Sequence, residues 1–336
     1  MVLKHARISY EKGLAMRVVI IGGTGHIGSY LTPRLVEAGY TVLCVSRGEK
    51  TPYRQHSAWK AIKYVVMDRD AEEAAGSFGE RIAALDAHTV IDLTCYKPES
   101  ARQIVDGLRG RVEHLLHCGT IWVHGPSVEV PTTEEAPRSA FGEYGIRKQA
   151  IEEYLLGESR RGFPVTMLHP GHLVGTGWNP LNPQGNFNPR VFSGLAQGIE
   201  VKLPNIGMET VHHVHADDVA QAFLCAMEHR SAALGESFHV VSPSAITLRG
   251  FAERMAAWFG RPAKLRFLPW EEWKATASER DAKATWDHIA HSPNCSIAKA
   301  RALLGYAPRY TSLEAVQEAV TAMQQSGVVV MAQTSA

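Results

Sequence analysis

Three glycines near the start of the chain have the spacing of a phosphate-binding turn. An apolar run over 18–21 leads into Gly22, Gly25 and Gly28, after which a helical pattern begins. Gly22 would permit a tight turn, Gly25 would let the backbone approach a pyrophosphate, and Gly28 would let the helix pack closely. The helix N-terminus would add free N–H groups and a positive dipole end. The pattern predicts a dinucleotide site, with an ordinary strand-turn-helix corner as the alternative.

Arg47 follows the second apolar run, at the position that distinguishes two nicotinamide cofactors. An acidic residue about 20 residues beyond the glycines usually grips the ribose hydroxyls of NAD. A guanidinium there would instead hold the 2′-phosphate of NADP through charge-assisted hydrogen bonds, with Lys50 as a helper. We therefore expect NADP as the preferred cofactor and NAD as the other candidate. A solvated surface arginine is the alternative interpretation of Arg47.

Tyr144 and Lys148 lie four residues apart, and so on one face of an expected helix. A free phenol has a pKa of about 10 and is a poor base at neutral pH. A nearby ammonium group favours the phenolate and lowers that pKa. The pair predicts an acid/base couple, although Tyr and Lys at this spacing are also common on solvated helices.

The elements that must position these residues alternate between short apolar runs and longer helical patterns. Such an alternation predicts an α/β fold with a parallel sheet covered by helices on both faces. The expected strands are 17–21, 41–45, 61–66, 89–93, 114–117 and 165–169, and the expected helices are 27–38, 98–108 and 143–159.

Beyond about Gly171 the chain changes character, because 179–188 is polar and rich in turn residues. There we expect helices over 189–197, 217–228, 248–259, 296–304 and 312–325, and short strands over 211–214 and 237–241. The predicted organisation is an N-terminal extension (1–16), a nucleotide-binding domain (17–171), a smaller and mostly helical substrate lobe (172–330) with some return to the sheet, and a loose tail (331–336).

Composition excludes several classes of protein. With 336 residues, 45% of them hydrophobic, the chain can bury a core and is not disordered. Its 35 Lys and Arg against 34 Asp and Glu give a charge of +1, which offers no field for nucleic acid or an anionic membrane. No apolar run is long enough to span a membrane, and the five cysteines form no C-x-x-C pair. We expect a cytoplasmic protein without nucleic-acid or membrane partners.

Histidines are the remaining candidates for metal ligands. His212, His213 and His215 stand together, but no carboxylate or cysteine accompanies them at a recognised spacing. His288 and His291 lie three residues apart, and we expect them to be a solvated pair. No metal is predicted.

Taken together, these motifs resemble the extended short-chain dehydrogenase/reductases, the superfamily that contains nucleotide-sugar epimerases and dehydratases. The resemblance spans about 17–320 and is carried by the segments 22–28, 68–70, 118–125, 144–148 and 305–314. It implies a Rossmann-type, doubly wound sheet. It also implies that Tyr144 is the catalytic acid/base, that Lys148 is its pKa partner and a ribose ligand, and that Thr120 hydrogen-bonds the reacting oxygen.

The resemblance implies further that Asp68 meets the adenine and that Leu93, Thr94, Pro170 and His172 flank the nicotinamide end. The full set expected to bind the cofactor is Gly22, Thr24, Gly25, His26, Ile27, Gly28, Arg47, Asp68, Arg69, Leu93, Thr94, Tyr144, Lys148, Pro170 and His172. Ligands of open α/β sheets bind at the carboxyl ends of strands. The expected substrate residues there are Tyr96, Trp122, His124 and His172, with a core role as the alternative for Trp122.

Departures from the family pattern limit the prediction of substrate. Thr120 is followed by Ile121-Trp122, where the family's 4,6-dehydratases have an Asp-Glu pair, and 211–215 lacks the arginine with which many members hold a diphosphate. The leading hypothesis is an NADP-preferring oxidoreductase that interconverts a hydroxyl and a carbonyl on a sugar-like small molecule. The alternatives are a nucleotide-sugar epimerase with retained NAD and a catalytically silent nucleotide- or RNA-binding relative. Helices 98–108 and 143–159 are candidates for a homodimer interface.

Overall fold

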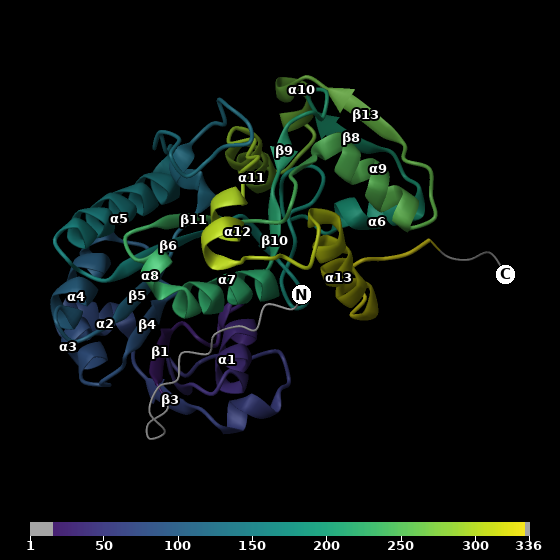
Figure 1. Cartoon of the computed structure of the whole chain (residues 1–336). Helices are drawn as coiled ribbons and strands as arrows, with labels where there is room; N and C mark the ends of the chain where they lie inside the picture. The colour runs from purple at the N-terminus through teal and green to yellow at the C-terminus, as the bar shows by residue number, and fades with distance from the viewer. Residues whose placement is uncertain (1–15, 333–336) are drawn as a thin grey trace, which may run out of the picture.

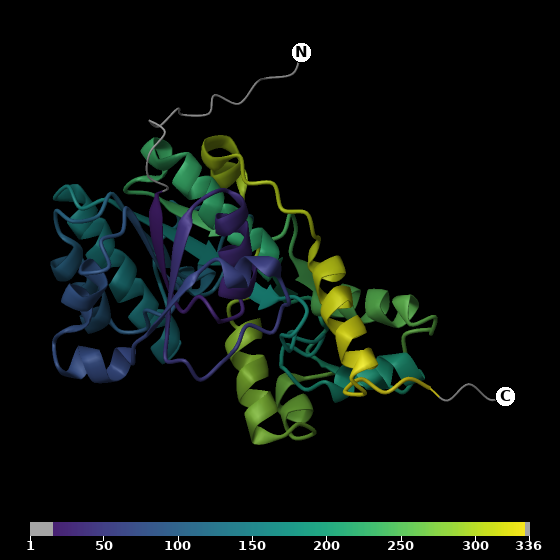
Figure 2. The same ribbon diagram turned by 90° about the horizontal axis from the view of Figure 1, so that it is seen from below.

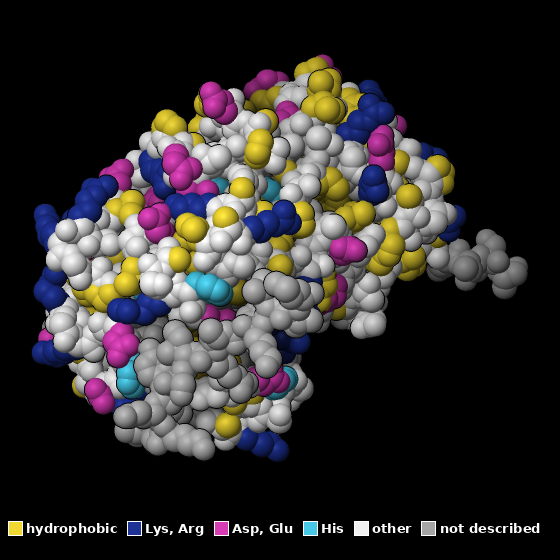
Figure 3. Space-filling model, viewed as in Figure 1, with side chains coloured by type: hydrophobic (Ala, Val, Ile, Leu, Met, Phe, Trp, Pro, Cys, Tyr) yellow, Lys and Arg dark blue, Asp and Glu magenta, His cyan; other side chains and the backbone are white. Residues whose placement is uncertain are grey.

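The computed structural model describes residues 16–332. The expected N-terminal extension (1–16) and loose tail (331–336) therefore lie almost entirely outside the described residues. No helix among the described residues is long and apolar enough to cross a membrane. On the face seen in Figure 3, basic and acidic side chains are interspersed, in keeping with the balanced charge of the chain.

A seven-stranded sheet forms the centre of the molecule, in the order β11-β6-β5-β4-β1-β2-β3 (Figure 1). Every strand pair in it is parallel. The strand order reverses between β1 and β4, which is where ligands bind in sheets of this kind. The predicted α/β, Rossmann-type doubly wound fold is confirmed. Its strands are β1 (Arg17–Ile21), β2 (Thr41–Ser46), β3 (Lys63–Val66), β4 (Thr89–Asp92), β5 (His114–Cys118), β6 (Val165–Pro170) and β11 (Ser237–Val240).

Two hydrophobic cores cover the two faces of this sheet. Val18 and Ile20 of β1 belong to one core, and the alternate residues Val19 and Ile21 belong to the other, as the period of a strand requires. The first core packs against α1 (Gly28–Glu37), α7 (Ala216–Glu228) and α12 (Ala298–Leu304), and the second against α3 (Phe78–Ala83), α4 (Pro98–Leu108) and α5 (Gly142–Arg160) (Figure 2). Burial on both faces explains why the strands are almost continuously apolar.

The second half of the chain adds a third core beside the sheet, formed largely by short elements. Three two-stranded sheets lie here: β7 (His172–Val174) with β10 (His213–His215), β8 (Val201–Pro204) with β13 (Leu265–Leu268), and β9 (Thr210–Val211) with β12 (Ile246–Thr247). The helices are α6 (Arg190–Gln197), α8 (Arg230–Ala233), α9 (Leu248–Trp258), α10 (Trp270–Lys274), α11 (Glu279–Ile289) and α13 (Ser312–Gln325).

Sequence patterns missed most of the short elements. The expected strand 211–214 is divided at His212 into β9 and β10, and the expected strand 61–66 begins only at Lys63. Strands of two to four residues show too little alternation to be recognised. The other elements that were not predicted in the sheet half are α2 (Arg69–Ala74), α3 and the 3-10 turns η1 (Ser57–Lys60) and η2 (Ile121–His124).

Candidate active site

The register of the sheet brings the predicted cofactor residues to one edge. Ile21 at the end of β1 pairs with Val45 on one side and Asp92 on the other, so the segments that follow all three strands meet. They enclose a cavity of about 330 Å³. Its lining is Ile21, Gly22, Thr24, Gly25, Val45, Ser46, Arg47, Gly48, Glu49, Lys50, Met67, Arg69, Asp70, Phe78, Thr94 and Tyr96.

The glycines of this turn are required by its geometry. Gly22 has a φ of +86°, and a Cβ added to it would lie 2.5 Å from Cγ2 of Thr94. A Cβ on Gly28 would lie 2.3 Å from the carbonyl oxygen of Gly23, so only glycine lets α1 approach the turn. The cavity therefore presents bare backbone at one end and the cations Arg47 and Lys50 at the other. Such a cradle fits the diphosphate and ribose phosphate of a dinucleotide.

Arg47, after β2, and Arg69, after β3, line this cavity, but Asp68 does not. Arg47 is 55% exposed and pairs with Glu49 at 3.2 Å, so its guanidinium remains accessible. Asp68, which was expected to meet the adenine, instead caps α2 by accepting the backbone N–H of Ala71 at 3.2 Å. It does not line the cavity, whereas its neighbour Arg69 does.

Eight other residues predicted to bind the cofactor also lie outside the cavity lining: His26, Ile27, Gly28, Leu93, Tyr144, Lys148, Pro170 and His172. Ile27 and Leu93 are buried in the first core, and Pro170 is the buried last residue of β6. The ring of His26 stacks on Trp178, with the ring centroids 4.6 Å apart. Burial lowers the pKa of His26 to about 4, so its imidazole is neutral at pH 7.

The structure brings Tyr144, Lys148 and Thr120 together at the carboxyl end of β5. Thr120 follows β5, and its side chain interacts with that of Tyr144. Nζ of Lys148 is buried and donates to the carbonyl oxygens of Cys95 at 2.8 Å and Cys118 at 2.7 Å. These carbonyls follow β4 and end β5, so Lys148 ties α5 to two strands.

The pKa of Tyr144 differs from the sequence-based expectation. Tyr144 is 43% exposed as a whole, but burial around its hydroxyl raises its pKa above the ordinary value, and the interaction with Thr120 only partly offsets this. Nζ of Lys148 lies 6.0 Å from the centroid of the Tyr144 ring and is committed to two carbonyls. Spacing along the helix predicted that Lys148 would lower this pKa, and that prediction is wrong because the ammonium group points to the backbone. The phenol is therefore protonated at pH 7.

Aromatic rings and imidazoles surround the catalytic candidates. Trp122 lies edge-on to Tyr144 with centroids 5.8 Å apart, and edge-on to His172 with centroids 6.4 Å apart. His288 and His291 also contact Trp122. Both are buried, so the expectation of a solvated pair is wrong. The apolar surface of Trp122 and its neighbours accounts for that burial.

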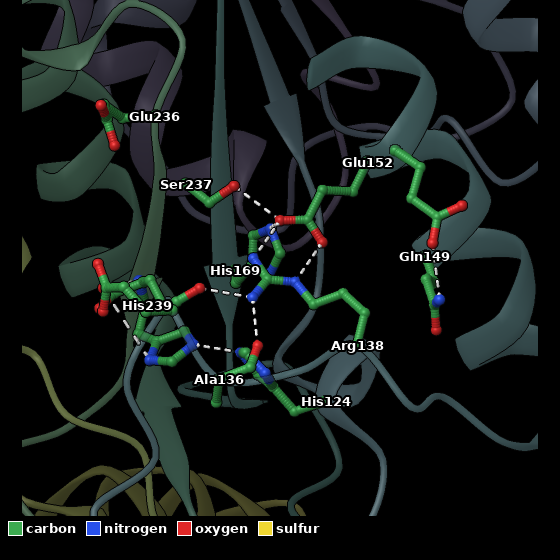
Figure 4. Close-up of polar contacts among 12 residues, drawn as sticks. His124, Ala136, Arg138, Gln149, Glu152, His169, Glu236, Ser237 and His239 are labelled. Atoms are coloured by element: carbon green, nitrogen blue, oxygen red, sulfur yellow. Dashed lines mark hydrogen bonds and ion pairs between the residues drawn. The ribbon is translucent and has the colours of Figure 1, made fainter. Parts of the chain in front are cut away.

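The remaining substrate candidates lie in two different places. Tyr96 is half exposed beside the cofactor cavity, and Nζ of Lys148 lies 4.8 Å above its ring. His124 is buried away from Tyr144 in a polar network, where its Nε2 lies 2.8 Å from Nε2 of His239 (Figure 4). His124 was expected to contact substrate, but its position at the end of η2 turns it towards β11 instead.

Glu152 is the centre of that network, and sequence reasoning missed it. Its carboxylate accepts two hydrogen bonds from Arg138, at 2.7 and 3.0 Å, and one from Ser237 at 2.7 Å (Figure 4). Nε2 of His169 lies 3.3 Å away. Burial would raise the pKa of Glu152, but His169 and Arg138 outweigh it and hold that pKa well below its usual range. The signal in the sequence was a glutamate next to Ile151 on the apolar face of α5.

The clustered histidines of 212–215 each have a partner of their own. His212 Nε2 lies 2.9 Å from the Ser242 carbonyl oxygen, and His213 Nε2 lies 3.2 Å from that of Leu181. His215 contacts Glu318. Among residues 16–332, no group of three or more His, Cys, Asp or Glu side chains is placed to hold a metal ion.

A doubly wound sheet with a glycine cradle at its switch point, and a Tyr-Lys-Thr cluster beside it, defines an NAD(P)-dependent enzyme. The family model described as the NAD dependent epimerase/dehydratase family matches residues 18–240. The chain belongs to this family, which confirms the predicted resemblance.

Individual relatives are distant. The chain is 27% identical over 279 residues to a 2'-dehydrokanamycin reductase of Streptomyces kanamyceticus, covering 82% of this chain and 76% of the relative. It is 23% identical over 313 residues to a chloroplast stem-loop binding protein of Arabidopsis thaliana, covering 90% of this chain and 78% of the relative. A UDP-glucose 4-epimerase structure with UDP-glucose, from Thermotoga maritima, has a TM-score of 0.71 at 21% identity, covering 93% of this chain and 99% of that one. The last likeness supports the fold alone.

Proposed function

We propose that the protein is an NADP-preferring ketoreductase that interconverts a carbonyl and a hydroxyl group on a sugar-like small molecule. The observation that carries the proposal is the convergence of Thr120, Tyr144 and Lys148 beside the glycine-lined cavity. The similarity to a reductase whose name specifies a dehydrokanamycin supports a sugar-type ketone as the substrate.

The chain's own residues have distinct parts in this reaction. When bound, the nicotinamide supplies the hydride that reduces the carbonyl carbon, or accepts it in the reverse direction. The Thr120 hydroxyl orients the substrate oxygen, and Tyr144 donates the proton that this oxygen needs on reduction. At pH 7 Tyr144 is protonated, which is the form that can donate this proton.

The preference for NADP rests on charge at the far end of the cavity. Arg47 and Lys50 both line it, and the guanidinium of Arg47 is partly free in solvent. A 2′-phosphate there would form charge-assisted hydrogen bonds that NAD cannot form. The nearby Glu49 would partly offset this preference by pairing with Arg47.

Replacing Tyr144 by phenylalanine tests the reductase hypothesis. We expect the Tyr144→Phe variant to bind NADPH normally but to lose about 100-fold or more in kcat, because proton transfer is removed. Oxidation of NADPH with a panel of ketosugars gives the measurement. Tyr154→Phe, on the same helix and partly buried, is the control and should retain activity. Full activity in Tyr144→Phe would refute the proposed role, and stoichiometric NAD⁺ released from the purified protein would indicate an epimerase instead.

Replacing Arg47 by aspartate tests the cofactor preference. The ratio of NADH to NADPH dissociation constants should fall by about tenfold or more, because one charge-assisted interaction is exchanged for repulsion. Arg266→Asp, at an exposed position on β13, should leave the ratio unchanged. An unchanged ratio in the Arg47 variant would place the 2′-phosphate elsewhere.

A further inference from the structure

The side chains in ring contact with Trp122 are the phenol of Tyr144 and three imidazoles. Trp122 stacks on His291 with centroids 4.2 Å apart, and it meets His172 and His288 edge-on. The ammonium group of Lys148 is committed to two backbone carbonyls. None of the side chains in ring contact with Trp122 carries a positive charge at pH 7, since burial lowers the pKa of all three histidines.

Hydrogen bonds fix which nitrogen carries the proton in two of these imidazoles. Nδ1 of His172 accepts the backbone N–H of His212 at 3.2 Å, so in the neutral ring the proton is on Nε2. Nδ1 of His291 lies 2.5 Å from the carbonyl oxygen of Asp287, to which it must donate, so its Nε2 carries a lone pair. His172 therefore offers a donor and His291 offers an acceptor.

Neither of these two Nε2 atoms has a hydrogen-bond partner among the residues that the structure describes, although both are buried. His291 is only 1% exposed. Buried polar atoms without partners are costly, so a ligand group that pairs with them gains affinity. A hydroxyl group can accept from His172 and can donate to His291, whereas a phosphate oxygen would face the lone pair of His291.

We propose that the substrate is an unphosphorylated, hydroxyl-bearing ring compound, bound beside Trp122 with hydroxyl groups paired to Nε2 of His172 and His291. A nucleoside diphosphate sugar is disfavoured, because none of the side chains in ring contact with Trp122 is a cation that could pair with a diphosphate. This inference rests on the proposed reductase function.

Calorimetric titration of the NADPH-loaded protein with UDP tests the inference without turnover. We expect no binding of UDP at concentrations up to about 1 mM, and no inhibition by UDP of the reduction of a methyl ketopyranoside. Micromolar UDP binding that competes with the ketopyranoside would overturn the inference and leave the reductase function standing. A protein that binds NADPH and reduces no ketone would overturn the proposed function, and this inference with it.

Replacing His291 by phenylalanine provides the second test, since a phenyl ring can keep the stacking while removing the acceptor. The KM for the ketopyranoside should rise about fivefold, because the variant loses one neutral hydrogen bond to the substrate, and kcat should change less. His229→Phe, at an exposed position, is the control. An unchanged KM in a folded His291→Phe protein would show that this imidazole does not bind substrate.

Discussion

His114 lies in β5 with its ring buried, and its Nε2 is 2.8 Å from Oγ1 of Thr166. Burial, assisted by the charge of Arg230, lowers the pKa of His114 from 6.5 to about 3. The folded chain therefore holds a neutral imidazole at a pH where the unfolded chain binds a proton. His114 adds stability above pH 6.5, and that stability is lost as the pH falls through 6.5 towards the folded pKa.

The size of the effect follows from proton linkage. Between about pH 7 and pH 5.5, one histidine with these two pKa values removes about 1.3 kcal/mol from the free energy of unfolding. Other buried histidines have pKa values lowered to about 3 or 4 and add losses of the same sign: His26, His124, His212, His213 and His288. The free energy of unfolding should therefore fall steeply as the pH is lowered, and His114 should account for about 1.3 kcal/mol of that fall.

His114→Gln measures the contribution of His114 alone, because glutamine does not titrate and its amide can still donate a hydrogen bond to Thr166. Urea unfolding followed by tryptophan fluorescence at both pH values gives the loss for each protein. The variant should lose about 1.3 kcal/mol less than the unmodified protein on acidification. His229→Gln, at an exposed site, should behave like the unmodified protein. An equal loss in His114→Gln and the unmodified protein would refute the claim that His114 is neutral when folded.

Two further substitutions test the cradle and the buried network. Gly22→Ala should weaken NADPH binding about tenfold or more and lower stability by about 1–3 kcal/mol, because φ is +86° and the new Cβ would meet Thr94. Gly76→Ala is the control, because Gly76 has a φ of +69° but a Cβ there would meet no atom within 4 Å, so this variant has only the backbone strain. An equal loss of stability in the two variants would show that the contact with Thr94 contributes nothing. Glu152→Gln should lower the free energy of unfolding by about 3 kcal/mol, since it leaves a guanidinium without its carboxylate. A similar result for the exposed Glu153→Gln would contradict a special role for the network.

The fold was predictable because most of its strands are buried on both faces. Expected strands such as 89–93 and 165–169 are found within one residue of their predicted ends as β4 and β6. In contrast, α11 was missed because its buried side includes Thr285 and His288 as well as Ala282 and Ile289. Two of these four buried residues are polar, so the buried side of α11 is not marked by apolar residues alone.

Motif positions along the sequence located the catalytic candidates, but their surroundings depend on distant parts of the chain. His291 was expected in solvent because Pro293 follows it and no third metal ligand accompanies it and His288. It is buried because Phe141 lies on it with a centroid distance of 4.0 Å, and Trp122 lies on it at 4.2 Å. His124 was expected to contact substrate, yet it meets His239, 115 residues away. No local pattern reports such contacts.

The helix α5 shows why spacing alone could not set the chemistry of Tyr144. Lys148 fixes the helix to the ends of β4 and β5 through two carbonyls, and Glu152 fixes it to Ser237 of β11 and to Arg138. These attachments hold Tyr144 beside Thr120 but commit the ammonium group to the backbone. The phenol is protonated at pH 7 and can donate a proton in the proposed reduction. The tertiary partners of α5, rather than its i,i+4 spacing, therefore set the surroundings of Tyr144.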